Sequence, residues 1–238
     1  TLTVNGAEHA SRLGNGILRG FTTEQLDYAA GDAGPALPDH THLRSLLLVH
    51  GSADARAYFL VLDDVNTKSG EAVHNYFHPA NETQVEVLQE NAVYSAKIDH
   101  YPTIPGASLG LFFANIPDAV KIEKVQGAIP QRYPDYPEHN RLEEIYGNTA
   151  GPIATVLFPY KTNETLPDFE RINSNNLNGG IIAHSANIQD IILSSSGEGA
   201  RSYADIMLQG KAALLRKDGS DLDFIFIQAG TEFKSPEL

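Results

Sequence analysis

The sequence contains no cysteine, and its only methionine is Met207. The absence of cysteine excludes disulfides, thiolate nucleophiles and cysteine-based zinc sites. It does not identify the compartment, since a secreted protein of this size can fold without disulfides. The chain also lacks any run of about 18 apolar residues, so the sequence predicts no membrane span. No signal-peptide pattern opens it either.

Basic residues are also scarce. The chain has 17 Lys and Arg residues against 30 Asp and Glu residues, which leaves a formal net charge of −13 at pH 7. A charge of this size repels phosphate backbones, so we expect no nucleic-acid partner. Sulfated or uronate polysaccharides would also be repelled on average, unless basic residues cluster locally.

The length and the apolar content indicate a folded β protein. The 238 residues are 42% hydrophobic, which excludes a disordered chain and leaves ample material for a core. This length suits one large β domain or two small ones. Because the chain starts at Thr1 and has its only methionine far downstream, we expect a processed product or a fragment of a longer protein.

Strand-like patterns occur along most of the chain. Residues 43–50 and 56–65 are β-rich runs, and the polar residues 51–54 between them predict a hairpin loop. Similar short runs lie at 71–78, 84–89, 92–98, 108–115, 120–125, 153–158, 180–184, 188–193, 212–216 and 222–228. Short strands with regular turn signals predict an all-β protein, an antiparallel multi-stranded β-sandwich with long loops and little helix. The best helix candidate is the short stretch 140–146.

A segment rich in proline and tyrosine interrupts this pattern at residues 127–152. Prolines at this density do not fit sheet interiors, so we expect a long loop between a first sandwich part, 1–126, and a second part, 153–238. The second part could be a separate small sheet. Tyr133, Tyr136 and Tyr146 in the loop could bind substrate by packing on the apolar face of a sugar ring. Alternatively, these rings anchor the loop to its own sandwich.

Two histidines form the densest group of potential metal ligands. His40 and His42 are two residues apart, so on an extended chain they point to one side and could bind one ion. A third ligand would come from a neighbouring strand, such as Asp63, Asp64 or His74. The alternative is that both histidines are solvated residues that lead into the following strand.

A second histidine pair lies on one predicted strand. His74 and His78 share a strand face with Tyr76 between them. Such a face could supply a general base and a general acid, because histidine titrates near neutral pH and tyrosine can donate a proton. The same pattern fits a strand whose tyrosine packs and whose histidines line a polar seam.

Two adjacent aspartates end one of the β-rich runs. Asp63 and Asp64 should point to opposite faces of their strand, so they cannot form a paired acid/base couple. We expect one of them to cap a turn or to pair with a basic residue such as Arg44 or Arg56.

A series of short motifs, in the same order, resembles the C-terminal β-sandwich region of the heparinase II/III-like polysaccharide lyases, a group that includes alginate and oligoalginate lyases. The motifs are LTVNG at 2–6, LDYAAGDA at 26–33, LRSLLLV at 43–49, YFLVLDD at 58–64, FH at 77–78 and ATVLFP at 154–159. Together they extend over most of the chain.

The resemblance implies a role in β-elimination. In this family an α/α toroid domain precedes the sandwich, and the two form a cleft in which a base removes the C5 proton of a uronate. The family's catalytic and metal-binding residues lie upstream of the position of Thr1. The chain is therefore expected to hold no catalytic residue, metal or cofactor of its own, although the parent enzyme could carry a divalent metal. His40, His42 and His78 match no catalytic motif of the family.

The implied partners are an acidic polysaccharide or oligosaccharide and the N-terminal toroid of the parent enzyme, in a secreted or periplasmic setting. The alternative function is a stand-alone carbohydrate-binding β-sandwich module that uses the tyrosine-rich loop.

Overall fold

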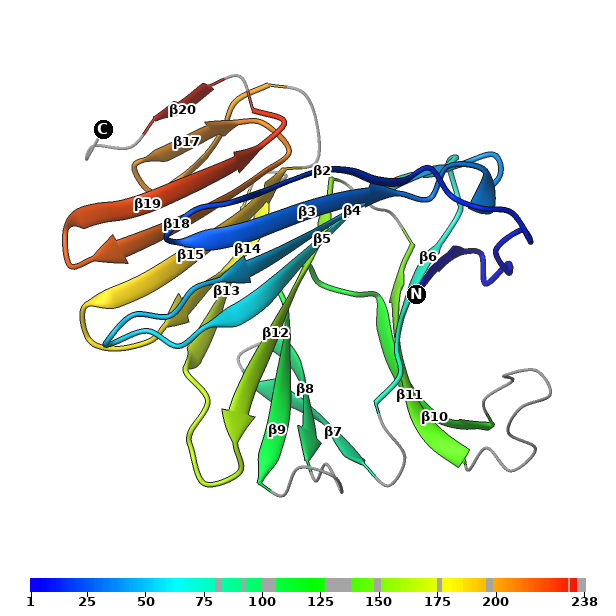
Figure 1. Ribbon diagram of the computed structural model, residues 1–238, viewed down its shortest axis with the longest axis horizontal. Coiled ribbons are helices and arrows are strands. Elements are labelled where there is room, and N and C mark those ends of the chain that lie inside the picture. The colour runs from blue at the N-terminus through cyan, green and yellow to red at the C-terminus, as the bar shows by residue number, and fades with distance from the viewer. Residues whose placement is uncertain are drawn as a thin grey trace.

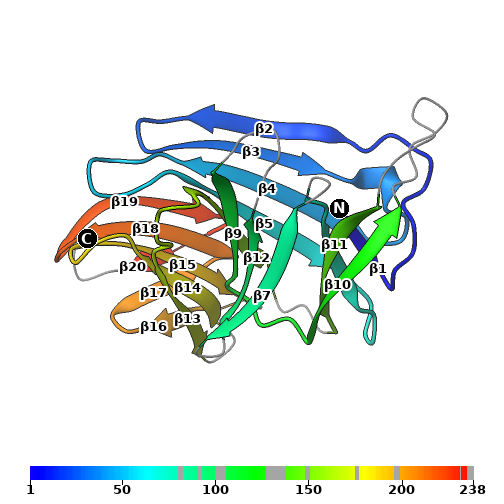
Figure 2. The same cartoon turned by 90° about the horizontal axis from the view of Figure 1, so that it is seen from below.

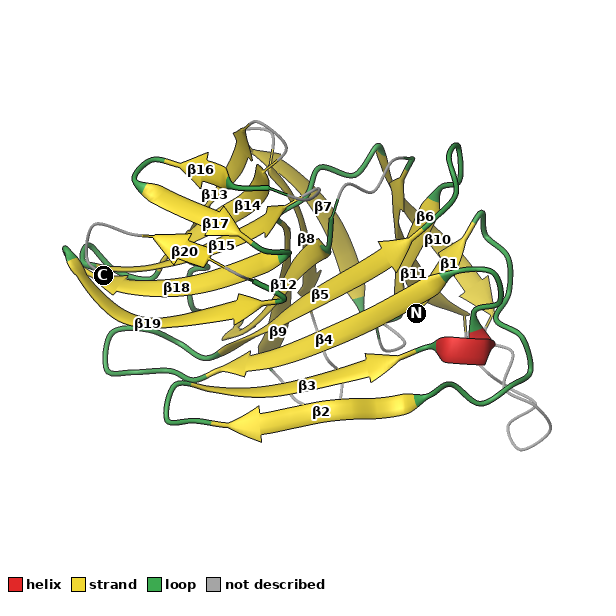
Figure 3. Ribbon diagram, turned by 90° about the horizontal axis from the view of Figure 1, so that it is seen from above, coloured by secondary structure: helices red, strands yellow, loops and turns green. Residues whose placement is uncertain are grey.

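The predicted all-β antiparallel sandwich is confirmed by the computed structural model. It describes residues 1–79, 83–90, 93–99, 106–126, 138–147, 151–174, 177–195, 199–230 and 232–234. Within these ranges the only helical segment is the 3₁₀ turn η1 (Gly34–Ala36), and the strands form four sheets (Figure 3). In the described part of the chain, no helix has the length and apolarity needed to cross a bilayer.

The strands are distributed over the four sheets as follows. The central sheet has the order β2 (Gly16–Thr22), β3 (Leu26–Asp32), β4 (Thr41–Val49), β5 (Tyr58–Asn66), β12 (Ile153–Lys161), β9 (Ala107–Phe113), β8 (Val93–Asp99) and β7 (Gln84–Glu90). The four-stranded sheet has the order β1 (Leu2–Val4), β6 (Val73–Phe77), β11 (Glu138–Tyr146) and β10 (Ala119–Gln126). The five-stranded sheet has the order β13 (Asp168–Ser174), β14 (Leu177–Ala183), β15 (Ile188–Ser195), β18 (Ala212–Asp218) and β19 (Asp221–Gln228). The three-stranded sheet has the order β16 (Arg201–Tyr203), β17 (Ile206–Gln209) and β20 (Glu232–Lys234).

The predicted hairpin of residues 43–50 and 56–65 is confirmed as the antiparallel pair β4 and β5. Its register runs from Thr41 opposite Asn66 to Val49 opposite Tyr58. The two strands lie side by side in the middle of the central sheet (Figure 1). Their continuous apolar runs follow from this place, since a strand inside a layered structure buries both of its faces.

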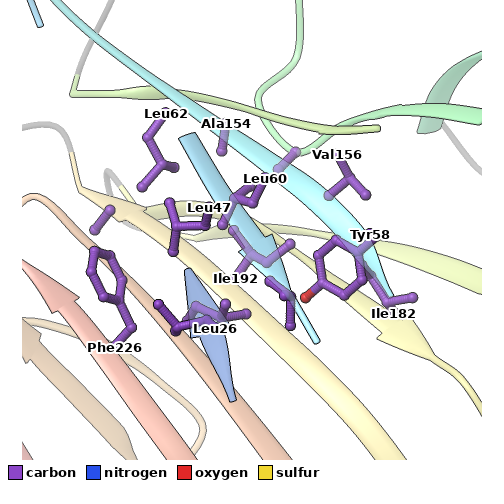
Figure 4. Close-up of a cluster of buried hydrophobic side chains, with 14 of the residues drawn as sticks. Leu26, Leu47, Tyr58, Leu60, Leu62, Ala154, Val156, Ile182, Ile192 and Phe226 are labelled. Atoms are coloured by element: carbon purple, nitrogen blue, oxygen red, sulfur yellow. The ribbon is translucent and has the colours of Figure 1, made fainter. Parts of the chain in front are cut away.

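The largest apolar cluster lies between the central sheet and the five-stranded sheet. Leu47 and Leu60 of the central sheet pack with Ile182 and Ile192 of the five-stranded sheet, and all four are fully buried (Figure 4). The segments before residue 127 and after residue 152 therefore contribute side chains to one core.

Smaller apolar clusters join the remaining layers. Leu142 of β11 packs with Leu111 and Phe113 of β9, which fixes the four-stranded sheet to the other face of the central sheet. Leu208 of β17 packs with Leu215 of β18, which fixes the three-stranded sheet to the five-stranded sheet. The resulting order of layers is four-stranded, central, five-stranded and three-stranded (Figures 1 and 2).

The expected helical turn at 140–146 is wrong, because these residues belong to β11. This strand lies inside the four-stranded sheet, where Glu143 pairs with Tyr76 of β6 and with Lys121 of β10. Its side chains alternate between the two faces of the sheet, which is strand periodicity. The segment 127–152, expected to be a loop, therefore contains a strand, while residues 127–137 and 148–150 lie outside the described residues.

Candidate functional site

The four-stranded sheet carries a polar face on the side away from the central sheet, which we call the outer face. Its side chains come from β6, β11 and β10, and from His78 directly after β6. They are His74, Tyr76, His78, Lys121, Glu123, His139, Arg141 and Glu143. The predicted shared face of His74, Tyr76 and His78 is confirmed, since each contacts a β11 residue of this set.

A carboxylate orients one histidine of the outer face. The Nδ1 atom of His74 donates to Oε1 of Glu143 at 2.7 Å, and the ring of His74 stacks on Tyr76 with centroids 6.3 Å apart. Burial alone would raise the pKa of Glu143, but hydrogen bonds from His74 and Tyr76 outweigh it and lower the pKa. The ionised Glu143 thus accepts the N–H of Nδ1 and fixes the orientation of the His74 ring.

An arginine covers the tyrosine of the outer face. The guanidinium carbon of Arg141 lies 5.0 Å from the ring centroid of Tyr76, and its NH2 group donates to Glu123 at 2.7 Å. Burial is the main reason why the pKa of Tyr76 is raised, so its hydroxyl keeps its proton. The outer face therefore offers an aromatic ring, a planar cation and several proton donors, which are groups that recognise acidic sugars.

The charge of the outer face differs from that of the whole chain. Arg141 and Lys121 balance Glu123 and Glu143 there, whereas the whole chain carries a formal net charge of −13. The outer face is thus locally free of the general excess of negative charge, which reduces its repulsion of an acidic ligand.

Directly behind the outer face, an ion cluster lies between the four-stranded and central sheets. Arg44 donates from Nε and NH2 to the two oxygens of Asp63 at 2.7 and 2.9 Å, and His42 donates from Nε2 to Oδ1 at 2.7 Å. The predicted pairing of one of the two aspartates with Arg44 is confirmed. Burial alone would raise the pKa of Asp63, but His42 and Arg44 outweigh it and lower the pKa.

Asp64 lies on the other side of the same strand, as the sequence predicted. It forms an ion pair with Lys211, at the side of the central sheet that faces the five-stranded sheet. Together with His42 and Leu18, this ion pair lines a cavity of about 750 Å³. The two aspartates consequently have no common role.

A second buried carboxyl group accompanies the Asp63 cluster. Glu144 is fully buried on the inner face of β11, where it accepts a hydrogen bond of 2.8 Å from the hydroxyl of Tyr146. Burial, together with the negative charge of Asp63, raises the pKa of Glu144 to about 8, against the effects of Tyr146, Asn75 and Arg44. Glu144 is therefore mostly protonated at neutral pH.

Of the three predicted substrate-binding tyrosines, Tyr146 lies within the described residues. Tyr146 is 4% exposed and packs with Leu2 and Val73 between two sheets, so its ring is not available to a sugar. Tyr133 and Tyr136 lie outside the described residues, and their contact with substrate stays a prediction.

The histidines proposed as a metal pair have separate partners. His42 binds Asp63, whereas Nδ1 of His40 lies 3.5 Å from Oε2 of Glu71. Among the residues that the structure describes, no group of three or more histidine, cysteine, aspartate or glutamate side chains is placed to hold a metal ion.

The sequence did not reveal a further ion cluster between the central and five-stranded sheets. Arg216 donates from Nε and NH2 to Asp190 at 2.7 and 2.8 Å, and His184 donates from Nε2 to the same carboxylate at 2.9 Å. Hydrogen bonds from both partners outweigh the effect of burial and lower the pKa of Asp190. A single aspartate inside the apolar run 188–193 was the available signal, since a buried charge requires a partner.

The polar residues of β11 were also missed. His139, Arg141 and Glu143 lie in the segment that was expected to be a loop. Alternation of polar and apolar residues was the signal that could have identified them as a strand. Glu144 interrupts this alternation, because it is an acidic residue at a position where an apolar one is expected.

Comparisons with known proteins show the fold. No known protein family matches the sequence, and no curated protein matches it. The solved structure of a heparan sulfate lyase HepC mutant from Pedobacter heparinus is similar, with a TM-score of 0.56 and 15% identity over 83% of this chain. The structure of a heparinase III matches 92% of this chain with a TM-score of 0.54 and 13% sequence identity. That of another heparinase III matches 85% of this chain with a TM-score of 0.50 and 14% sequence identity. This chain covers only 27–29% of the length of these proteins. The comparisons therefore show that its fold is similar to one portion of a heparinase.

Proposed function

We propose that this chain is the β-sheet portion of a polysaccharide lyase that cleaves uronate-containing polysaccharide by β-elimination. In this proposal its outer face forms part of the surface along which the acidic saccharide lies. The observation that carries the proposal is the pairing of Arg141 with Tyr76 on a locally charge-balanced sheet face. The fold shared with a portion of the heparan sulfate lyase supports it.

The chemistry of the outer face suits a uronate. The guanidinium of Arg141, held over the ring of Tyr76, donates one N–H to Glu123 and can donate others to a carboxylate of the ligand. His74, held by Glu143, adds an imidazole that can hydrogen-bond to a hydroxyl group of the saccharide. In this proposal the outer face binds the saccharide and orients its uronate group.

The wider features of the proposal come from the family resemblance. A toroid domain would supply the other wall of the cleft and the main catalytic residues, and the parent enzyme could hold a divalent metal. The saccharide would be a heparan sulfate-like chain, by analogy with the similar heparan sulfate lyase, or alginate, as the family resemblance implies. The setting would be secreted or periplasmic, where such polysaccharides occur.

Binding of acidic oligosaccharides tests the role of the outer face. We expect Arg141→Gln to weaken binding about tenfold or more, because a charge-assisted hydrogen bond contributes roughly 1.5–3 kcal/mol. Calorimetry with heparan sulfate and alginate oligosaccharides measures the effect and also distinguishes the two substrates. A neutral oligosaccharide serves as the reference ligand.

The matched control for this measurement is Arg56→Gln. Arg56 also lies 5.0 Å from an aromatic ring, that of Phe158, and also pairs with a glutamate, Glu164, but it is far from the outer face. Equal affinity of Arg141→Gln and the unchanged chain would contradict the proposed surface. The alternative, a stand-alone binding module that uses the tyrosine-rich loop, predicts instead that Tyr133→Ala abolishes binding.

In this proposal the isolated chain shows no lyase activity, because the family resemblance implies that the toroid supplies the main catalytic residues. β-Elimination produces an unsaturated uronate, so the measurement is ultraviolet absorbance during incubation with uronate polysaccharides. A rise in absorbance would show that the chain holds its own catalytic set. In that case His74→Ala and Tyr76→Phe would be the first variants to compare.

A further inference from the structure

Two histidines on the outer face bring ring nitrogens together. Nδ1 of His78 lies 3.0 Å from Nε2 of His139, and the ring centroids are 5.3 Å apart with planes inclined by 48°. His78 follows the last residue of β6, and His139 is the second residue of β11, so two adjacent strands hold the pair. Both side chains are at least partly exposed at the edge of the outer face.

This separation allows two states of the pair. With one proton between the nitrogens, one ring donates a hydrogen bond to the other. Alternatively, one cation takes the place of that proton. Zinc–nitrogen bonds are about 2.0–2.1 Å long, so nitrogens 3.0 Å apart would subtend an angle of about 95° at the metal. That angle suits adjacent positions of an octahedral ion, and widening the separation by about 0.4 Å would give a tetrahedral angle.

The charges near the pair also bear on a bound cation. Two cations act on this pair, the amino group of Thr1 and the guanidinium of Arg141, and the guanidinium is paired with Glu123 at 2.7 Å. A bound cation would therefore depend on the two imidazole nitrogens for its attraction to this place.

We propose that His78 and His139 form a binding site for a divalent transition-metal cation such as Zn²⁺. Two imidazoles favour zinc, copper or nickel over calcium and magnesium, which prefer oxygen ligands. In the described part of the chain no third protein ligand completes the site, so its remaining positions are open to water or to a carboxylate from a ligand on the outer face. The site does not require that the chain be part of a lyase.

Titration of the metal-free chain with ZnCl₂ tests the proposal. Calorimetry is expected to detect one site, and His78→Ala and His139→Ala are each expected to weaken Zn²⁺ binding about tenfold or more, as loss of a ligand must exceed the 10–100-fold effect of losing an outer-shell partner. The control is His50→Ala, since His50 is a partly exposed histidine held by Asp27 and the Glu24 carbonyl elsewhere in the chain. That variant should bind Zn²⁺ like the unchanged chain.

A spectroscopic readout identifies the ligands. With one equivalent of Cu²⁺, electron paramagnetic resonance should show two coordinated nitrogens in the unchanged chain and no more than one in either variant. Circular dichroism confirms that each variant is folded. The proposal is overturned if the unchanged chain binds no Zn²⁺, or if both alanine variants keep its affinity and its copper spectrum.

Discussion

Replacing Asp190 with alanine is expected to lower the free energy of unfolding by about 3–5 kcal/mol, the cost of removing one partner from a buried ion pair. Asp190 and Arg216 are almost completely buried between the central and five-stranded sheets, and His184 shares the same carboxylate. Without Asp190, the guanidinium would lose two hydrogen bonds of 2.7 and 2.8 Å in a place that water does not reach. Denaturant unfolding at pH 7, followed by circular dichroism, measures the loss.

Two further variants make this test specific. Asp64→Ala removes an aspartate from the pair with Lys211, whose side chain is half exposed, and is expected to cost no more than about 1 kcal/mol. Asp190→Asn keeps the shape of the side chain but removes its charge. Its free energy of unfolding should therefore lie between those of Asp190→Ala and the unchanged chain. Similar losses for Asp190→Ala and Asp64→Ala would show that burial of the ion pair does not determine its importance.

Glu144→Gln is expected to stabilise the protein at alkaline pH. The pKa of Glu144 is raised from 4.5 to about 8, so between these values the folded state binds a proton that the unfolded state releases. Stability of the unchanged chain therefore falls as pH rises through this window, whereas glutamine does not titrate. The free-energy advantage of Glu144→Gln should grow by about 3 kcal/mol between pH 5 and pH 8. Denaturant unfolding of both proteins at several pH values measures it.

The adjacent residue provides a control of opposite sign. The pKa of Glu143 is lowered, so its ionised form stabilises the folded state above the usual carboxyl pKa, and this contribution is lost as pH falls through the lowered value. Glu143→Gln should therefore destabilise the protein at pH 7, through loss of the ionised acceptor for His74. If both glutamine variants changed stability in the same direction, the opposite environments assigned to these neighbours would be refuted.

Several features of the fold and the site could be predicted from local patterns. The hairpin of β4 and β5 was evident from two β-rich runs and the polar loop between them. The shared face of His74, Tyr76 and His78 and the opposite faces of Asp63 and Asp64 followed from alternation along a strand. For one of the two aspartates, a turn cap or a pair with a basic residue such as Arg44 or Arg56 was expected, and Asp63 pairs with Arg44.

Other features depend on contacts between distant segments. β11 was misread because Glu144 occupies an inward position where the pattern calls for an apolar residue. Its carboxyl group is accommodated there by the proton that it keeps and by the hydrogen bond from Tyr146. Neither property can be inferred from the residues next to it.

The sequence by itself determined that this protein is an antiparallel β protein, because alternation and turn residues are local properties of the chain. Only the tertiary structure decided which face of each strand is buried and which charges meet. Glu143 and Glu144 are neighbours in sequence, yet stacking of one sheet on another places Glu144 in the interior and Glu143 on the outer face. Likewise, His78 meets His139 because β6 pairs with β11, 61 residues away along the chain. Sheet stacking and strand register set these environments, and both depend on segments that are far apart in sequence.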